Sequence, residues 1–439
     1  MILVDEALRA RAAEGRPIRV GMVGAGFMAR GIARQLRLAL PGLELVAVAN
    51  RTLERAHEIV TRAGYPHVHE VDDPDAVDRM AAEGAVALTR DARVLCAASA
   101  VDVLIEATGA VEFGAGFLLD AISHRKDVVS LNAELDATVG PVLQQRAQAA
   151  GVLITGADGD QPAVQMNLAR TVLALGLTPM VCGNVKGLQD RYRTPATQAA
   201  FAAQWGQTPA MVTSFADGTK ISMEQALVAN ALDLTVAERG MLGPRYEGHV
   251  DDLRATFLAD PGLERLQALG GIVDYVVGAQ PSPGVFILAA NDDPERAIYL
   301  RYGKLGDGPL YSFYVPYHLT ALEVPLSVAR IALFRDHVVS SRPGAPRVEV
   351  IACAKRDLRA GEVLDGLGGF LTYGVCERSE VLAREGLVPI GVTEGARVVR
   401  AVARDAALTL DDLELPEGRH VLDLWREQAA AFARPDGGP

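Results

Sequence analysis

The residues with the clearest chemical potential form a glycine-rich turn near the amino terminus. The segment GAGFMA, residues 24–29, follows an apolar run and precedes a helical pattern. Its first glycine permits a tight turn out of a strand, its second lets the backbone approach a pyrophosphate, and the alanine allows close helix–strand packing. The helix that begins here would offer its free N–H groups to the phosphates. We therefore expect a dinucleotide to contact Gly24, Gly26, Phe27 and Met28.

The residues after the second expected strand indicate which dinucleotide binds. An Asp or Glu at this position would accept a hydrogen bond from the ribose 2′-OH of NAD. This chain instead has Asn50-Arg51-Thr52, and its first carboxylate is Glu54. An arginine and polar side chains suit a 2′-phosphate, so NADP is expected, with NAD as the alternative. The simpler interpretation of Arg51 is a solvated loop charge.

Two later loops also follow expected strands, and open α/β sheets bind ligands at the carboxyl ends of their strands. Thr108 and Gly109 would lie along the nicotinamide, where a glycine permits close backbone approach. Asn132 would meet the nicotinamide or its ribose, or would simply cap the following helix. Glu134 lies two residues later and is expected near the substrate.

Hydride transfer to a carbonyl requires a proton donor or base beside the reacting carbon. Asp158 and Asp160 follow the last expected strand and are candidates, although acids at a helix N-terminus also complement its dipole. Lys186, at the end of an apolar strand, ranks first among the lysines, and Lys220 ranks second. Glu224 lies four residues after Lys220 and would pair with it on a helix.

Three further residues are expected at the substrate. Arg245, in GMLGPR, would bind a carboxylate or phosphate, or face water. Lys304 lies in a glycine-rich loop, and His318 lies among aromatic and apolar residues, where a satisfied core histidine is the simpler interpretation. No HxxxH pattern and no carboxylate cluster has convincing metal spacing, so no metal ligand is predicted.

A doubly wound parallel sheet is expected to position these residues. Continuous apolar runs at 18–24, 43–49, 101–108, 126–132 and 151–157 are typical of strands buried on both faces. Helical patterns separate them, and the first two runs with the helix over 28–40 form a βαβ unit. A short helix is expected over residues 1–16.

Beyond residue 157 the pattern changes to shorter elements. MVCGNVKG, GIVDYVVGA, GVFILAAN, YLRYGKL and LYSFYV are predicted strands of an antiparallel sheet, and MVTSFADGTKISMEQALVANAL a strand, a turn and a helix. The Pro/Gly/Arg segment 340–347 predicts a linker. We therefore predict an α/β chain with three domains: a Rossmann domain over 1–157, an α+β substrate domain over 158–345, and a small β-rich domain over 346–439.

Composition limits the classes of partner. The 439 residues are 49% hydrophobic and 22% charged, and the net charge of −12 without a basic patch argues against nucleic acid. No apolar run reaches the roughly 18 residues of a membrane span. The four scattered cysteines are expected to be reduced thiols. We expect a soluble, cytoplasmic protein with a small-molecule substrate.

The order of several segments resembles the homoserine dehydrogenase-like proteins with a C-terminal SAF domain, a group that includes the DXR-like (DRL) proteins. These segments are GMVGAGFMA, IEATG, SLNAELD, GADGDQP, FADGTKISMEQALVANA, GMLGPR, DYVVGAQPSPGVF and GDGPLYSFYVPYHLTALEVPLSVAR. The resemblance implies a Rossmann domain, a central catalytic and dimerisation domain, and an SAF-like tail from about residue 348. DXR-like members can make 2-C-methyl-D-erythritol 4-phosphate from 1-deoxy-D-xylulose 5-phosphate.

The combined expectation is an NADP-dependent dehydrogenase or reductase acting on a small, polar, anionic carbonyl compound. A sugar phosphate such as 1-deoxy-D-xylulose 5-phosphate, reduced after rearrangement of its skeleton, is the most concrete substrate. Homoserine dehydrogenase is the first alternative, although the chain lacks a clear GDGTG-type loop and an ACT-like tail. A catalytically silent NADP-binding sensor and a tail that acts as a lid over a sugar acid are the others. A homodimer or homotetramer is expected.

Overall fold

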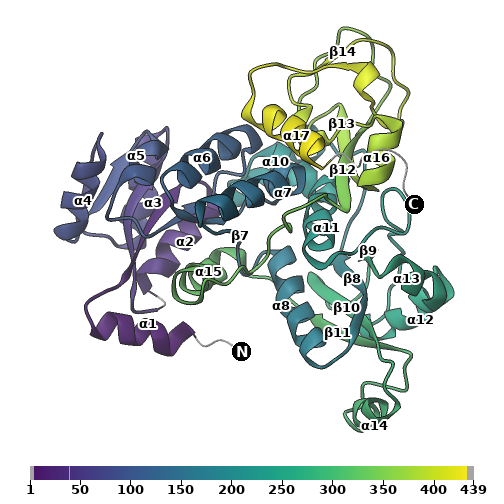
Figure 1. Ribbon diagram of the computed structural model, residues 1–439. Helices are drawn as coiled ribbons and strands as arrows, with labels where there is room; N and C mark the ends of the chain where they lie inside the picture. Colours follow the sequence, from purple (N-terminus) through teal and green to yellow (C-terminus); the bar gives the residue numbers. More distant parts are fainter. Residues whose placement is uncertain (1–3, 39, 433–439) are drawn as a thin grey trace. The chain divides into compact units, whose positions relative to one another are not determined.

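The computed structural model describes residues 4–38 and 40–432, and its chain forms two compact units (Figure 1). The first unit comprises Met1–Asp160, Leu319–Gly344 and Asp423–Pro439. The second comprises Gln161–His318 and Ala345–Leu422. Each unit therefore combines segments that are far apart in the sequence. The three consecutive domains expected from the sequence stay a prediction.

The first unit is built on a parallel sheet of seven strands in the order β3-β4-β2-β1-β5-β6-β7. After β4 the chain returns to the other side of β1 as β5, so the strand order reverses between β1 and β5. This arrangement confirms the doubly wound Rossmann-like fold expected from the apolar runs. The strands are β1 (Ile18–Val23), β2 (Leu43–Ala49), β3 (Val68–Glu70), β4 (Val86–Thr89), β5 (Val103–Glu106), β6 (Asp127–Ser130) and β7 (Ile154–Gly156).

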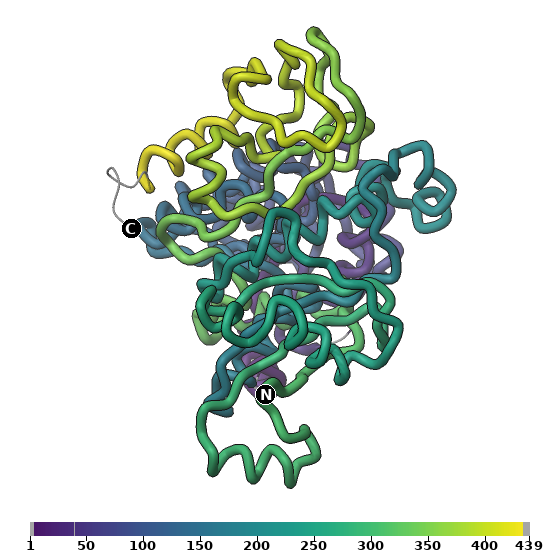
Figure 2. The backbone as a smooth tube through the Cα atoms, turned by 90° about the vertical axis from the view of Figure 1, so that its right-hand side faces the viewer, coloured from purple at the N-terminus to yellow at the C-terminus, as the bar shows by residue number. Residues whose placement is uncertain are grey.

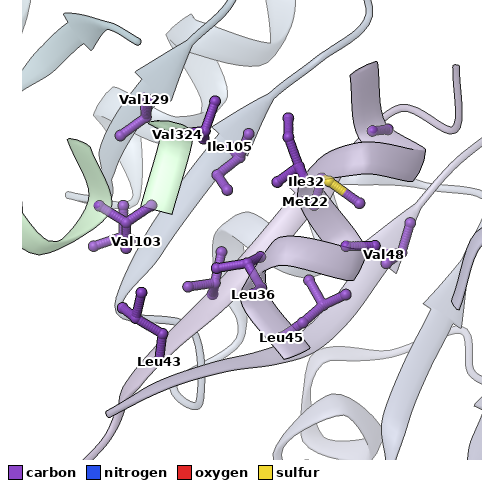
Figure 3. Close-up of a cluster of buried hydrophobic side chains, with 14 of the residues drawn as sticks. Met22, Ile32, Leu36, Leu43, Leu45, Val48, Val103, Ile105, Val129 and Val324 are labelled. Carbon is purple, nitrogen blue, oxygen red and sulfur yellow. The ribbon is translucent and has the colours of Figure 1, made fainter. Parts of the chain in front are cut away.

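Helices cover this sheet, and one of them comes from late in the chain. Figure 3 shows apolar side chains of β1, β2, β5 and β6 packed with Ile32 and Leu36 of α2 and with Val324 of α15. The expected helix over 1–16 is α1, and residues 1–3 and 39 lie outside the described part of the chain. The helices are α1 (Val4–Ala13), α2 (Phe27–Leu38), α3 (Leu53–Ala63), α4 (Pro74–Ala82), α5 (Ala92–Ala97), α6 (Val111–Ser123), α7 (Ala133–Ala150) and α15 (Thr320–Phe334).

A buried polar network attaches α15 to the loop after β7. The Ser327 hydroxyl accepts from the Asp158 amide at 2.6 Å and donates to Asp158 Oδ2 at 2.9 Å. Arg330 Nη1 donates to Asp158 Oδ1 at 2.7 Å, while its Nε donates to Asp336 at 2.9 Å. The side chains of Asp158 and Arg330 are 4% and 17% exposed. This network explains why residues far beyond β7 belong to the first unit.

The second unit is built on a mixed sheet in the order β11-β10-β8-β9, in which only β8 and β9 run parallel. The expectation of an antiparallel sheet is therefore wrong for that pair. Helices α8 and α11 pack on one face, and α12 and α13 join the apolar core of the other face. The strands are β8 (Thr178–Lys186), β9 (Ile272–Val277), β10 (Gly284–Ala290) and β11 (Leu310–Val315), and the helices are α8 (Gln161–Ala174), α9 (Pro195–Trp205), α10 (Pro209–Asp217), α11 (Thr219–Leu232), α12 (Leu253–Ala259) and α13 (Leu263–Leu269).

Two predicted strands of this unit are helical, because proline-containing caps start helices there. The expected strand at the start of MVTSFADGTK is α10, where Thr208 caps the helix by accepting from the Met211 amide and a proline opens the first turn. The expected strand YLRYGKL is the end of α14 (Pro294–Tyr302) and the turn after it. Asp293 caps α14, which projects between β10 and β11 and has no buried residue (Figures 1 and 2).

The last part of the second unit is β-rich, as expected. Strands β12 (Val348–Ala354) and β13 (Thr372–Arg378) pair antiparallel, and β14 (Arg397–Val398) pairs with β15 (Leu413–Glu414). Helix α16 (Ser379–Glu385) follows β13, and α17 (His420–Ala431) follows β15. Residues 433–439 lie outside the described part of the chain. Within residues 4–38 and 40–432, no helix has the length and apolarity to cross a membrane.

The Asp158–Arg330 pair gives a test of how α15 is held. Replacing Arg330 by methionine leaves a buried carboxylate uncompensated, so we expect the free energy of unfolding to fall by about 3 kcal/mol. The matched control is Arg62→Met, since Arg62 pairs with Glu58 on the exposed surface of α3 and should cost less than about 0.5 kcal/mol. Urea denaturation of both variants measures the difference, and equal losses would show that the network does not hold α15.

Candidate active site

The glycine turn lies where the strand order reverses, between β1 and β5. Gly24 has φ +110°, and a Cβ there would lie 2.7 Å from the carbonyl oxygen of Ala107 at the end of β5. Only glycine fits this position. At Gly26 an added Cβ would meet nothing within 4 Å, and α2 begins at the next residue. The turn therefore has the backbone approach and the open side that a pyrophosphate requires.

The two other predicted residues of this turn begin α2. Phe27 is half-buried, and the guanidinium of Arg30 lies over its ring at 5.5 Å. Met28 is half-buried and packs against the apolar core of the first unit. Their backbone N–H groups lie in the first turn of a twelve-residue helix, where a phosphate gains from the helix dipole. Direct contact of either side chain with a cofactor stays a prediction.

The loop after β2 carries exposed positive charge. Asn50 Nδ2 donates to the carbonyl of Thr52 at 2.7 Å and so shapes the turn, while the Arg51 side chain is exposed. Arg90 Nη1 donates to the Arg51 carbonyl at 2.8 Å. Arg90 follows β4, the neighbour of β2 in the sheet, and was missed in the sequence. The basic residue after the short apolar run of β4 was the available signal.

A buried acid organises the loop after β5. Glu106 ends β5 with no exposed surface, and it accepts from the Thr108 amide at 2.8 Å, from the Thr108 hydroxyl and from Ser130 Oγ at 3.2 Å. Burial raises the pKa of Glu106 above its usual value. Gly109 adopts φ +65° in the same loop. The sequence analysis missed Glu106, although an acid at the end of an apolar strand could have indicated it.

Asn132 has a structural task at the start of α7. Its Oδ1 accepts from the Leu135 amide at 3.1 Å, and its Nδ2 donates to the Ala110 carbonyl at 3.2 Å. The side chain thus caps α7 and ties it to the loop that carries Thr108. Contact of Asn132 with a nicotinamide stays a prediction. Glu134 lies buried in the first turn of α7.

The two aspartates after β7 have different surroundings. The Asp158 carboxylate is engaged by Ser327 and Arg330, which favours a positioning role over acid–base chemistry. Asp160 is half-buried at the end of the same loop, where its amide donates to the Ala157 carbonyl at 3.2 Å. A catalytic role for either stays a prediction.

In the second unit, two of the candidate lysines lie near one buried carboxylate. Lys186, at the end of β8, donates to the Phe215 carbonyl at 3.0 Å. Burial lowers the pKa of Lys186, although the Glu224 and Asp217 carboxylates oppose the shift by favouring the charged amine. Lys220 Nζ lies 4.0 Å from Glu224 Oε1, and these side chains are 12% and 7% exposed. Two mostly buried lysines near an acid form a plausible acid–base centre.

A buried ion pair supports the segment that holds Lys186. Lys355, just after β12, has its Nζ 2.9 Å from Asp217 Oδ2, and the two side chains are 2% and 0% exposed. Lys355 also donates to the carbonyls of Arg193 at 2.8 Å and Gly369 at 2.7 Å. All three of its N–H groups thus have acceptors, so the buried charge is fully compensated. The sequence analysis did not identify Lys355.

The remaining candidates are spread over the second unit. Arg245 is exposed and follows a loop held by Asp274, whose carboxylate accepts from the Gly243 amide at 2.9 Å. Burial raises the pKa of Asp274 to about 7. Lys304 is exposed in the turn after α14, and His318 Nε2 lies 3.3 Å from Gln161 Nε2. Substrate binding by Arg245, Lys304 and His318 stays a prediction.

Clusters of metal-ligand side chains do not occur in the described ranges 4–38 and 40–432, where no group of three or more His, Cys, Asp or Glu could hold an ion. The four cysteines are buried and unbridged.

Two family models match the chain. Residues 21–155 match the NAD-binding domain of homoserine dehydrogenase, and residues 159–324 match the catalytic domain of oxidoreductase DRL. With the Rossmann-like sheet and its glycine turn, these matches define the class: an oxidoreductase that uses a nicotinamide cofactor. The chain belongs to the homoserine dehydrogenase-like oxidoreductases of the DRL family. The expected resemblance is confirmed, whereas the SAF tail stays a prediction.

Solved structures resemble the chain distantly. The 3-ketoreductase KijD10 from Actinomadura kijaniata, in complex with TDP-benzene and NADP, is 14% identical, and the match covers 73% of this chain and 91% of that one with a TM-score of 0.38. An oxidoreductase from Agrobacterium radiobacter in complex with NAD+, L-tartaric acid and magnesium is 14% identical over 42% of this chain and 48% of that one, with a TM-score of 0.29. The chain thus spans about half the length of this second protein. No curated protein matches the sequence.

The glycine turn yields a paired prediction. In Gly24→Ala the new Cβ would lie against the Ala107 carbonyl at positive φ, so we expect both a lower unfolding temperature and weaker NADPH binding. In Gly26→Ala the new Cβ meets open space, so the unfolding temperature should be unchanged while NADPH binding weakens at least about tenfold. Thermal unfolding and NADPH fluorescence titration measure the two effects. Unchanged NADPH affinity in Gly26→Ala would place the pyrophosphate elsewhere.

The Lys355–Asp217 pair yields a second prediction. Lys355→Met leaves Asp217 buried without its cation, so the free energy of unfolding should fall by about 3 to 5 kcal/mol. Adding Asp217→Asn removes the stranded charge and keeps an acceptor for the Thr219 amide, so the double variant should regain part of the loss. Urea denaturation of the two single variants and the double variant completes the cycle. Additive losses would mean that the two side chains do not interact.

Proposed function

We propose that this protein uses NADPH to reduce the carbonyl of a small polar substrate, with Lys186 as the proton donor. The observation that carries the proposal is the mostly buried group of Lys186, Glu224 and Lys220, which lies within the stretch matched to the DRL catalytic domain. The glycine turn of the first unit supports the cofactor half, because its open side at Gly26 fits a pyrophosphate. When bound, the nicotinamide supplies a hydride to the carbonyl carbon.

The chain's own residues then handle the proton. A Lys186 amine whose pKa is lowered by burial gives up a proton more readily than an exposed lysine, so it can protonate the oxygen as negative charge develops there. Glu224 keeps part of the lysine population charged, because its carboxylate favours the ammonium form. Lys220, paired with Glu224, adds positive charge that would stabilise the developing alkoxide.

The basic loop after β2 supports NADP over NAD. No carboxylate stands between β2 and Glu54 to accept from a ribose 2′-OH, while exposed Arg51 and Arg90 are joined by a hydrogen bond. Two guanidinium groups suit a 2′-phosphate dianion. In Arg51→Ala/Arg90→Ala, NADPH affinity should fall by tenfold or more while NADH affinity changes little. Titration with both cofactors decides this, and tighter NADH binding by the wild type would contradict the NADP assignment.

For the substrate we propose a sugar phosphate of the 1-deoxy-D-xylulose 5-phosphate type. Exposed Arg245 and Lys304 are the candidate partners of its phosphate. Homoserine dehydrogenase activity is the second candidate, favoured by the match of residues 21–155 to the NAD-binding domain of that enzyme. NADPH consumption with 1-deoxy-D-xylulose 5-phosphate or with aspartate semialdehyde separates the two.

The role of Lys186 predicts a pH profile. Reduction requires the protonated amine, so kcat for carbonyl reduction should fall as the pH rises through the lowered pKa of Lys186. Oxidation of the alcohol requires the neutral amine, so its rate should rise over the same interval. Lys186→Met should lower kcat by at least about a hundredfold and abolish this limb of the profile, with NADPH affinity preserved. A variant that keeps the wild-type limb would exclude Lys186 as the donor.

A further inference from the structure

Two carboxamides in the second unit are buried without hydrogen-bonding partners. Gln165 of α8 and Asn184 of β8 are 0% exposed. In each, both the oxygen and the nitrogen of the amide lack a partner among the described residues. Buried polar side chains are nearly always paired, and an unpaired one lowers stability. Two complete carboxamides left unpaired in one unit therefore need an explanation.

Both residues belong to the layer that contains Lys186. Asn184 precedes Lys186 by two residues on β8, so the two side chains share a face of the sheet. Val181 and Val185 point to the other face, into the core with α12 and α13. Helix α8 packs against β8 and β10, and α11, which carries Lys220 and Glu224, packs against α8, β8 and β9.

The position of Gln165 on α8 agrees with this placement. Gln165, Ala169 and Val172 are fully buried and form one stripe at helical spacing, and the exposed residues of α8 lie elsewhere on the helix. Gln161 begins the same stripe one turn earlier and is 8% exposed. The stripe therefore faces the packed layer of this unit.

We infer that Gln165 and Asn184 are substrate-binding residues for a compound that carries adjacent hydroxyl groups. This inference rests on the proposed function, since it assigns ligand contacts to the site of Lys186. Each carboxamide presents one acceptor oxygen and an NH2 donor, and a hydroxyl both donates and accepts. Two carboxamides therefore complement neighbouring hydroxyls, and they add no charge to a site that already holds two lysines.

Gln225 provides a matched comparison in the same unit. It is also 0% exposed, but its Nε2 donates to the Asp274 carbonyl at 2.8 Å. Its amide therefore fastens α11 to β9. Replacing Gln225 by methionine removes a made hydrogen bond, whereas replacing Gln165 by methionine or Asn184 by leucine removes polar groups that the protein leaves unpaired.

The experiment compares thermal unfolding of the NADPH-loaded full chain with and without ribitol, which has adjacent hydroxyls, or pentane-1,5-diol, which has none. We expect Gln165→Met and Asn184→Leu to unfold at the wild-type temperature or above, and Gln225→Met below it. Ribitol should raise the wild-type midpoint more than pentane-1,5-diol does. Its apparent affinity should fall about tenfold or more in Gln165→Met and Asn184→Leu, and stay unchanged in Gln225→Met.

Two results would overturn the inference. If Gln165→Met and Asn184→Leu are destabilised as much as Gln225→Met, the carboxamides are structural. If ribitol shifts the wild-type midpoint no more than pentane-1,5-diol, the ligand class is wrong. Failure of the wild type to oxidise NADPH with any carbonyl compound would refute the proposed function instead, and the unfolding midpoints would still decide the roles of the two carboxamides.

Discussion

The buried ion pair between Lys355 and Asp217 is the interaction on which the polar interior of the second unit depends. Neither charge could remain in this interior alone, because an uncompensated buried ion is strongly destabilising. Asp217 ends α10, and its other oxygen accepts from the amide of Thr219, the first residue of α11, at 2.8 Å. The pair therefore fixes the turn between α10 and α11. That turn lies between the carbonyl that receives Lys186 and the helix that carries Lys220.

The same region joins the C-terminal strands to α11. Thr219 Oγ1 accepts from the Gly374 amide at 2.9 Å, and Ser222 Oγ donates to the Gly374 carbonyl at 3.1 Å. Further along, Asn230 Nδ2 donates to the Val348 carbonyl at 3.0 Å. Strands β12 and β13 thus cover a helix whose residues are buried over almost its whole length. This contact gives the late segment a structural task in the unit that holds the candidate acid–base group.

The sequence predicts the elements whose pattern is local. Long apolar runs identified β1, β2 and β5, because parallel strands buried on both faces are continuously hydrophobic. Strands β3 and β4, with three and four residues, are too short to give that signal. Helix α10 was misassigned because its apolar residues also fit a strand, and the Thr-Pro cap that decides the matter was overlooked.

The site was predictable only in part, for the same physical reason. Lys186 and Lys220 were candidates because lysines are rare in this chain and one of them ends an apolar strand. Arg90, Glu106 and Lys355 acquire their meaning from partners far away in the sequence, which no local pattern reports. Lys355 and Asp217, for instance, are 138 residues apart.

The account's central claim, hydride transfer to a carbonyl with Lys186 as the donor of the proton, is tested most directly by isotope transfer. The protein would be incubated with NADPH deuterated at the transferable C4 position and with a panel of small carbonyl compounds that includes 1-deoxy-D-xylulose 5-phosphate and aspartate semialdehyde. Mass spectrometry would then detect the reduced products. The account predicts an alcohol carrying one deuterium on carbon, formed by the wild type and almost absent with Lys186→Met. Tight NADPH binding without a deuterated product from any compound would contradict it and favour a cofactor-binding sensor.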